Sequence, residues 1–101
     1  MIVYSVTCLV DDSIHDEWVD WMKSEHLPEV MATGKFLTHQ MFRIDPHDIN
    51  DDGTSYNIHY TLEKREDLQD YSVNFGPELK AKTLAKYGDK VIAFRTVLES
   101  V

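Results

Sequence analysis

Residues 14–30 constrain the fold of this chain more than any other segment, because their apolar side chains recur at helical spacing and then meet a histidine and a proline. A helix over 14–26, at about 100° per residue, gathers one set of side chains on a single face. The set is Ile14, Trp18, Trp21, Met22 and Glu25, with His26 at its edge. This face begins apolar and ends in ionisable groups. It is the one place where the sequence indicates a site, although nothing around it specifies a reaction.

The ends of this helix carry their own signals. Ser13 as N-cap would place Asp16 at the third helical position, which approximates a capping box. Pro28 disfavours helical dihedrals at Leu27. We therefore expect the helix to end near residue 26, with room for one further turn before Gly34.

Four segments have the pattern of β-strands: 2–10, 35–44, 54–63 and 90–99. In the first, the side chains expected on one side are Ile2, Tyr4, Val6, Cys8 and Val10. In the third, Tyr56, Ile58, Tyr60 and Leu62 face one way and Ser55, Asn57, His59 and Thr61 the other. In the last, Ile92, Phe94 and Leu98 share one side and Ala93, Arg95 and Val97 the other.

Two further helical segments lie between the third and the last strand. The first covers 64–75, with Leu68, Tyr71 and Phe75 at helical spacing, and the second opens at Pro77 and ends at Gly88. Its shared face is expected to hold Leu79, Thr83, Leu84 and Tyr87. The order is βαββαβ with the second helical region split, so we predict one α+β domain over 1–101, a ferredoxin-like fold with a four-stranded antiparallel sheet.

One sheet face would remain uncovered by helices. The side chains expected there mix apolar and polar types: Val3, Leu9, Ala93 and Val97 with Ser5, Thr7, Asn57, His59 and Arg95. This mixture is too apolar for plain solvent and too polar for a dry core. Isologous dimers are the commonest closed assemblies, so we predict a homodimer through this open sheet face.

Charge and cysteine content restrict the partners and the compartment. Eighteen acidic against ten basic side chains give a formal charge of −8, which repels phosphate backbones and anionic lipids. We therefore expect no nucleic-acid and no membrane partner. The lone Cys8 cannot form an intrachain disulfide, and the first residues have no basic leader and read as a strand. These features favour a cytoplasmic protein.

The chain resembles the dimeric α/β-barrel superfamily, in which two ferredoxin-like subunits pack sheet against sheet. It is most similar to a family of small bacterial proteins described as a domain of unknown function. The residues that carry the resemblance are 2–7, 18–22, 26–30, Tyr60, Phe94 and Arg95. The superfamily includes cofactor-free monooxygenases, lactone isomerases, haem enzymes and ligand-sensing domains, so the resemblance implies a fold but no single reaction.

The resemblance brings Trp18, Met22 and His26 forward as lining a pocket between the first helix and the sheet, and Tyr60 is a further candidate ligand-binding residue. His26 could act as a general base or orient a substrate, since a helix C-terminus and Glu25 or Glu29 would favour its protonated form. The alternative is a histidine that caps its own helix. For Trp18, Trp21 and Met22 the alternative is a plain core role.

The sequence contains no convincing metal or cofactor site. Residues 48–53 match the front of a calcium loop, but His59 stands at the twelfth position, where a bidentate carboxylate is required. The histidines lack zinc-ligand spacing, and His39 and His59 could face each other across neighbouring strands as polar filling. Cys8 is expected to be buried and unreactive. With no haem signature and no nucleotide-binding glycine loop, we expect no cofactor and no metal.

Two functions from different classes follow. The first is a homodimer that binds a small, partly aromatic or apolar molecule behind the first helix, as a cofactor-independent oxygenase or isomerase with His26 in the catalytic role. The second is a non-catalytic dimeric assembly or ligand-sensing module. A sizeable cavity that reaches His26 and Trp18 favours the first, and a closed helix-to-sheet layer favours the second.

Overall fold

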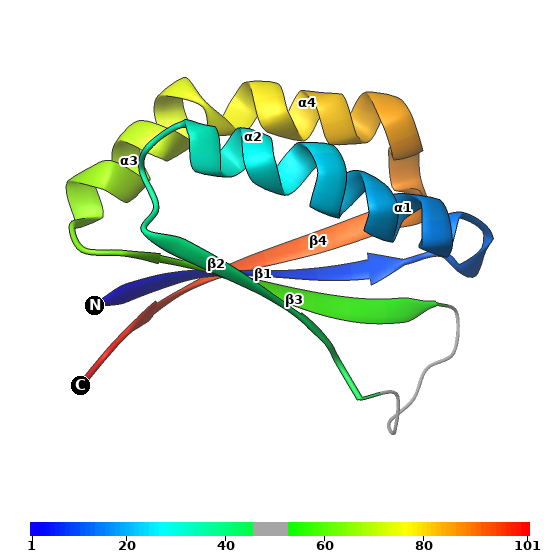
Figure 1. Ribbon diagram of the computed structural model, residues 1–101, viewed down its shortest axis with the longest axis horizontal. Coiled ribbons are helices and arrows are strands. Elements are labelled where there is room, and N and C mark those ends of the chain that lie inside the picture. The colour runs from blue at the N-terminus through cyan, green and yellow to red at the C-terminus, as the bar shows by residue number, and fades with distance from the viewer. Residues whose placement is uncertain (46–52) are drawn as a thin grey trace.

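The computed structural model describes residues 1–45 and 53–101, arranged as one antiparallel sheet with helices on one face (Figure 1). The strands are β1 (Ile2–Val10), β2 (Thr38–Arg43), β3 (Thr54–Leu62) and β4 (Val91–Glu99), in the order β2-β3-β1-β4. Each neighbouring pair is antiparallel. The predicted ferredoxin-like βαββαβ fold is therefore confirmed. None of the helices in the described part of the chain is long and apolar enough to cross a membrane.

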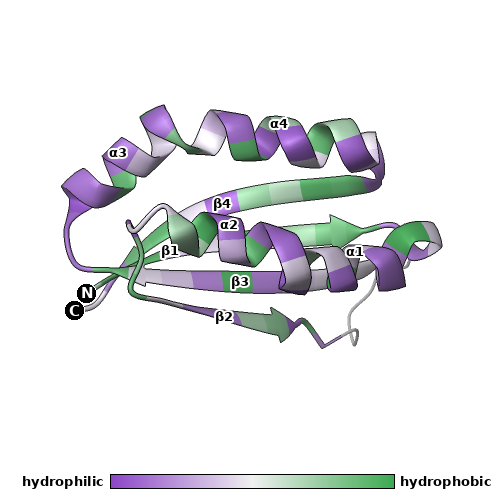
Figure 2. Cartoon of the chain, turned by 45° about the horizontal axis from the view of Figure 1, so that its top comes forward, coloured by the Kyte–Doolittle hydropathy of each residue, from purple (hydrophilic) through white to green (hydrophobic). Residues whose placement is uncertain are grey.

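Two helical arms cover the sheet (Figure 2). The first consists of α1 (His15–Trp21), a π turn (Met22–His26) and α2 (Leu27–Ala32), which follow one another without a break. The second consists of α3 (Arg65–Asn74) and α4 (Gly76–Tyr87), which meet at Phe75. Gly34 ends the first arm with a φ of 75°, a left-handed conformation that glycine adopts without steric cost.

The start and end of the first arm differ from the sequence prediction. Ser13 does not cap α1: a short 3-10 helix (Asp12–Ile14) precedes it, and Ile14 at the N-cap position of α1 makes no side-chain hydrogen bond. Asp11 caps that 3-10 helix, because its carboxylate accepts a hydrogen bond from the Ser13 backbone N–H at 2.8 Å. The helix also continues through Pro28, with Leu27 at φ −61° and ψ −44°. A π turn (Met22–His26) ends two residues before the proline, and its wider ring eases the clash that a proline otherwise makes with the preceding turn.

The π turn changes which side chains face the core. The Leu27 N–H bonds to the Met22 carbonyl, five residues back. Because the turn contains one extra residue, the side chains that follow it point in different directions around the helix axis than they would in a continuous α-helix. Trp18, Trp21 and Met22 are buried as predicted, but Glu25 is exposed and Leu27 takes its expected place in the core. The prediction of Glu25 on the core face is therefore wrong.

The faces of β4 are also the reverse of the expected arrangement. Arg95 pairs with Val6 and Ala93 with Cys8, and directly paired residues lie on the same face of a sheet. Ala93, Arg95 and Val97 therefore face the helices, and the open face receives Ile92, Phe94, Thr96 and Leu98. The open face is consequently more apolar than the sequence suggested, and Phe94 is 64% exposed on it.

A cluster of aromatic rings joins the sheet to the second arm. Phe36 stacks on Tyr4 with centroids 6.0 Å apart and meets Tyr71 of α3 edge-on at 4.8 Å. Tyr60 of β3 lies 5.0 Å from Phe36. Apolar burial of this kind is the main stabilising contribution in a domain of this size. Residues 48–52 of the calcium-like segment at 48–53 lie outside the described residues.

Candidate functional site

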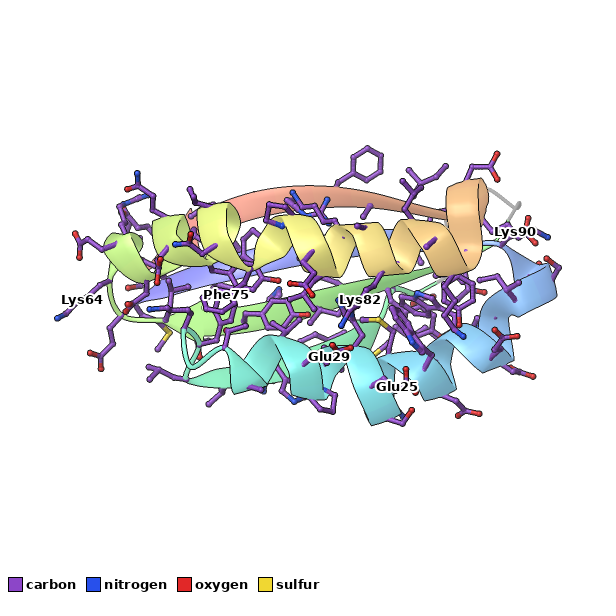
Figure 3. The ribbon with its side chains drawn as sticks, turned by 90° about the horizontal axis from the view of Figure 1, so that it is seen from above. Glu25, Glu29, Lys64, Phe75, Lys82 and Lys90 are labelled. Carbon is purple, nitrogen blue, oxygen red and sulfur yellow. The ribbon has the colours of Figure 1, made fainter. Side chains whose placement is uncertain are left out.

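A cavity of about 290 Å³ lies between the two helical arms and the sheet. Figure 3 views it from the helix side, where α4 and the first arm run beside one another above the strands. Val6 and Cys8 of β1, Ile58 of β3 and Ala93 of β4 contribute the sheet side of its lining. Leu79 and Thr83 of α4 line it from the second arm. The volume is at the lower end of the range for small-molecule sites, and the lining is largely apolar as such sites are.

The structure brings the four predicted pocket residues together around this cavity. Trp18 and Met22 line it from the first arm, and Tyr60 from β3. All three are almost fully buried, and Trp18 is only 1% exposed. His26 completes the group from the last position of the π turn. The tryptophan and the methionine thus belong both to the core and to the cavity wall, so the two interpretations of these residues are compatible.

His26 is a partly buried imidazole in the cavity wall. Its ring stacks on Trp21, with centroids 5.0 Å apart. Its Nδ1 atom is buried and has no hydrogen-bond partner among the described residues. A buried polar atom without a partner is uncommon and costs free energy, so it calls for an explanation such as an absent ligand or water. The helix continues past His26, so the histidine does not cap a helix end, and that interpretation is wrong.

Burial also determines the charge of His26. The pKa of its imidazole is lowered, because removal from water disfavours the charged form more than the nearby Glu29 favours it. Arg95 and Lys82 lower the pKa further through their positive charge. The sequence prediction of a protonated His26 near neutral pH is therefore wrong. A neutral imidazole can accept a proton, which a protonated one cannot.

Three tyrosines surround the cavity as neutral hydrogen-bonding groups. Burial raises the pKa of Tyr71 to about 12 and raises the pKa of Tyr4 and Tyr60 as well. The phenol groups are thus protonated at neutral pH. Each can donate one hydrogen bond from its hydroxyl group or accept one.

Arg95 and Lys80 were not predicted as site residues, yet both line the cavity. Arg95 was assigned to the open face because β4 is apolar on both sides and its alternation does not identify the inner one. The register of β1 against β4 determines which face of the sheet Arg95 lies on, and the sequence of one strand does not reveal that register. Leu84, expected on the buried face of α4, is 67% exposed and lines the cavity at its open side.

An ion pair connects the two arms above the cavity. Lys82 of α4 donates to the Glu29 carboxylate of α2 at 2.6 Å, and Figure 3 shows the two side chains directed toward one another. Both groups are partly exposed, so solvent screens the pair and it adds little stability. The ion pair nevertheless links α2 to α4 beside the cavity.

The remaining metal and nucleophile candidates do not form a centre. His39 pairs with Tyr60 and His59 with Gln40 and Ser5, so the two histidines lie on opposite faces and do not meet. In residues 1–45 and 53–101 no group of three or more potential metal ligands occurs. Cys8 is buried as expected, and burial raises the pKa of its thiol to about 11. A thiol of this kind is a poor nucleophile at neutral pH.

Comparison with known proteins gives a family match and several structural likenesses. A family model described as "Domain of unknown function (DUF4286)" matches residues 1–101. A search of curated proteins finds no match. Among solved structures, an ethyl tert-butyl ether d (EthD) family protein from Bacillus halodurans superposes with a TM-score of 0.68 at 14% identity, over 100% of each chain.

Two further structures have the same fold. A dimeric ferredoxin-like protein from an uncultured marine organism has a TM-score of 0.67 at 11% identity, over 99% of this chain and 94% of its own. SnoaB from Streptomyces nogalater, described as a cofactor-independent oxygenase, has a TM-score of 0.65 at 11% identity, over 98% of this chain and 92% of its own. At these identities the likeness shows the fold alone.

Proposed function

We propose that this chain, which belongs to the family described as domain of unknown function DUF4286, binds a small, partly apolar molecule in the cavity between its helices and sheet. The observation that carries the proposal is the buried Nδ1 of His26, which lacks a partner among the described residues and belongs to a wall that is otherwise largely apolar. A ligand with one polar group and an apolar body would satisfy both features.

The chemistry proposed for this site is proton transfer. Neutral His26 would accept a proton from an activated carbon of the ligand and leave a carbanion in a site lined by neutral phenols. Return of that proton to another carbon gives an isomerase. Reaction of the carbanion with dioxygen, which is then the oxidant, gives an oxygenase without a cofactor. SnoaB, with the same fold, is described as an oxygenase of that kind.

The proposal is tested by thermal-shift measurements with a library of small aromatic molecules. His26→Gln should keep the melting temperature within a few degrees of the parent and lose the stabilisation produced by the ligand that stabilises the parent. His39→Gln is the matched control, since His39 is exposed on β2 and does not line the cavity. Equal ligand-induced shifts in the parent and His26→Gln would contradict a role for His26 in binding.

We also propose a homodimer through the open sheet face. Apolar side chains gather on this face from the two edge strands: Phe42, Ile92, Phe94 and Leu98 are all exposed. At the centre, the Asn57 amide donates to Ser5 at 2.9 Å and to Thr7 at 3.0 Å, so the polar groups there are already paired with each other. Two of the similar structures are described as dimeric ferredoxin-like proteins.

Light scattering should give about twice the chain mass of 11.8 kDa, and a monomer at micromolar concentration would refute the dimer.

A further inference from the structure

The charges that line the cavity differ in sign from the charge of the chain. The chain carries 18 acidic and 10 basic side chains, for a formal charge of −8. The described residues that line the cavity nevertheless include two cations, Lys80 and Arg95, and no aspartate or glutamate. Both residues are exposed, so their charges lie where the cavity opens to solvent, and their field acts on any group that enters it. An anion would therefore be favoured in this cavity, although the molecule as a whole repels anions.

Arg95 is the cation whose position can be argued in most detail. It lies on β4 opposite Val6, on the face covered by the helices. Burial raises the pKa of Tyr4 of β1 and Tyr71 of α3, and the positive charge of Arg95 opposes that rise. At His26 burial lowers the pKa, and the charge of Arg95 lowers it further. Arg95 thus lines the cavity on the helix side of the sheet while it remains exposed to solvent.

Arg95 also has no carboxylate partner in the structure as described. The ion pairs found over 1–45 and 53–101 join other residues, namely His15 with Asp16, Lys35 with Asp70, Arg65 with Glu99 and Lys82 with Glu29. A guanidinium presents several N–H donors in a planar fork that fits both oxygens of a carboxylate. Arg95 acts on the Tyr4 hydroxyl through a hydrogen bond, and no described carboxylate occupies its remaining N–H donors.

We propose that the ligand of this cavity is a small organic carboxylate with an aromatic or branched apolar body, whose acidic group is bound by Arg95. This inference rests on the proposed function and names the class of its ligand. The apolar body lies against Trp18, Met22 and Ile58, and the carboxylate faces the guanidinium. A cavity of about 290 Å³ holds a molecule of roughly ten to fifteen non-hydrogen atoms.

The test compares 3-phenylpropanoate with 3-phenylpropanamide, which have the same shape and differ in charge. Dissociation constants are measured by NMR titration of the parent protein, Arg95→Gln and Arg95→Lys. The parent should bind the acid at least about tenfold more tightly than the amide, because a charge-assisted pair is stronger than a neutral one. Arg95→Gln should lose that preference and bind the amide as the parent does, and Arg95→Lys should retain part of the preference.

Arg65→Gln is the matched control, because it removes the same charge from an exposed ion pair with Glu99 outside the cavity. It should leave the preference for the acid unchanged. Equal affinity of the parent for acid and amide would overturn the carboxylate inference. A preference for the acid that persists in Arg95→Gln would overturn it too. In both cases the proposal that the cavity binds a ligand would stand. If neither probe nor any neutral aromatic fragment shifts resonances of the cavity wall, the cavity function itself fails, and this inference fails with it.

Discussion

The imidazole of His26 lies against the indole of Trp21, with ring centroids 5.0 Å apart and ring planes inclined by 29°. Trp21 in turn meets Tyr87 of α4 edge-on at 5.5 Å. The orientation of His26 is thus fixed by aromatic packing that involves both arms, and not by a hydrogen bond to Nδ1 within the described structure. A ring held in this way has a fixed orientation in the cavity wall.

The lowered pKa of His26 predicts a specific dependence of stability on pH. The unfolded chain keeps a histidine pKa near 6.5, so it binds more protons than the folded protein between the two pKa values. The free energy of unfolding should therefore fall as the pH is lowered from above 6.5 toward the folded-state pKa. An NMR titration of His26 should give a midpoint below 6.5.

His26→Gln removes this dependence and serves as the reference for that prediction. The melting temperature of the parent should drop more steeply between about pH 7 and pH 5 than that of His26→Gln. The charged groups that act on His26 are Glu29, Arg95 and Lys82, and all three are kept in His26→Gln, so the comparison isolates the imidazole. A His26 midpoint at or above 6.5 would contradict the lowering of its pKa by burial.

Cys8 should be almost unreactive in the folded protein. Burial raises the pKa of its thiol to about 11, which leaves far less thiolate at pH 8 than in the unfolded chain. Labelling by iodoacetamide should be about a hundredfold slower in native buffer than in denaturant. Comparable rates in the two conditions would show that the β1 wall of the cavity opens to reagents.

Filling the cavity should separate binding from stability. Ala93 lines the cavity opposite Cys8, so Ala93→Leu adds apolar atoms to empty space. We expect the variant to be as stable as the parent or more stable by up to about 1 kcal/mol, and to lose ligand binding. Ala85→Leu makes the same change at an exposed position of α4 and should leave binding intact. Undiminished binding in Ala93→Leu would place the ligand elsewhere.

A charge on the open sheet face should dissociate the proposed dimer. Phe94 is 64% exposed in the single chain, and Phe94→Asp would bury a carboxylate in the sheet-to-sheet interface. Light scattering should then report the mass of one chain. Val73→Asp is the control, since Val73 is equally exposed at 67% but lies on α3. If Phe94→Asp remains a dimer, the interface uses another surface.

The sequence predicted the topology because strand and helix periodicities in this chain are clear and all four glycines fall near element ends. It also predicted which residues of the first helix are buried up to Met22. The π turn was missed because one extra residue in a turn leaves no mark in composition or spacing. Its consequence, the exchange of Glu25 for Leu27 in the core, was missed with it.

Arg95 was missed for a different reason. Both faces of β4 are apolar, since one lies toward the cavity and the other carries exposed Ile92 and Phe94. Alternation identifies the inner face only when the outer face is polar. The sequence therefore predicted the side of the cavity lined by Trp18, Met22 and His26, and it did not predict that Arg95 of the last strand lines the cavity as well.

The central claim, that the cavity is a binding site, is tested most directly by NMR on ¹⁵N-labelled protein with a library of small aromatic fragments. Trp18 lines the cavity and Trp21 does not, so the two indole N–H signals form an internal pair. We predict that a bound fragment shifts the Trp18 signal and the amides of Val6 and Ala93 together, with a smaller effect at Trp21. Shifts confined to residues outside the cavity wall, or none across the library, would contradict the account.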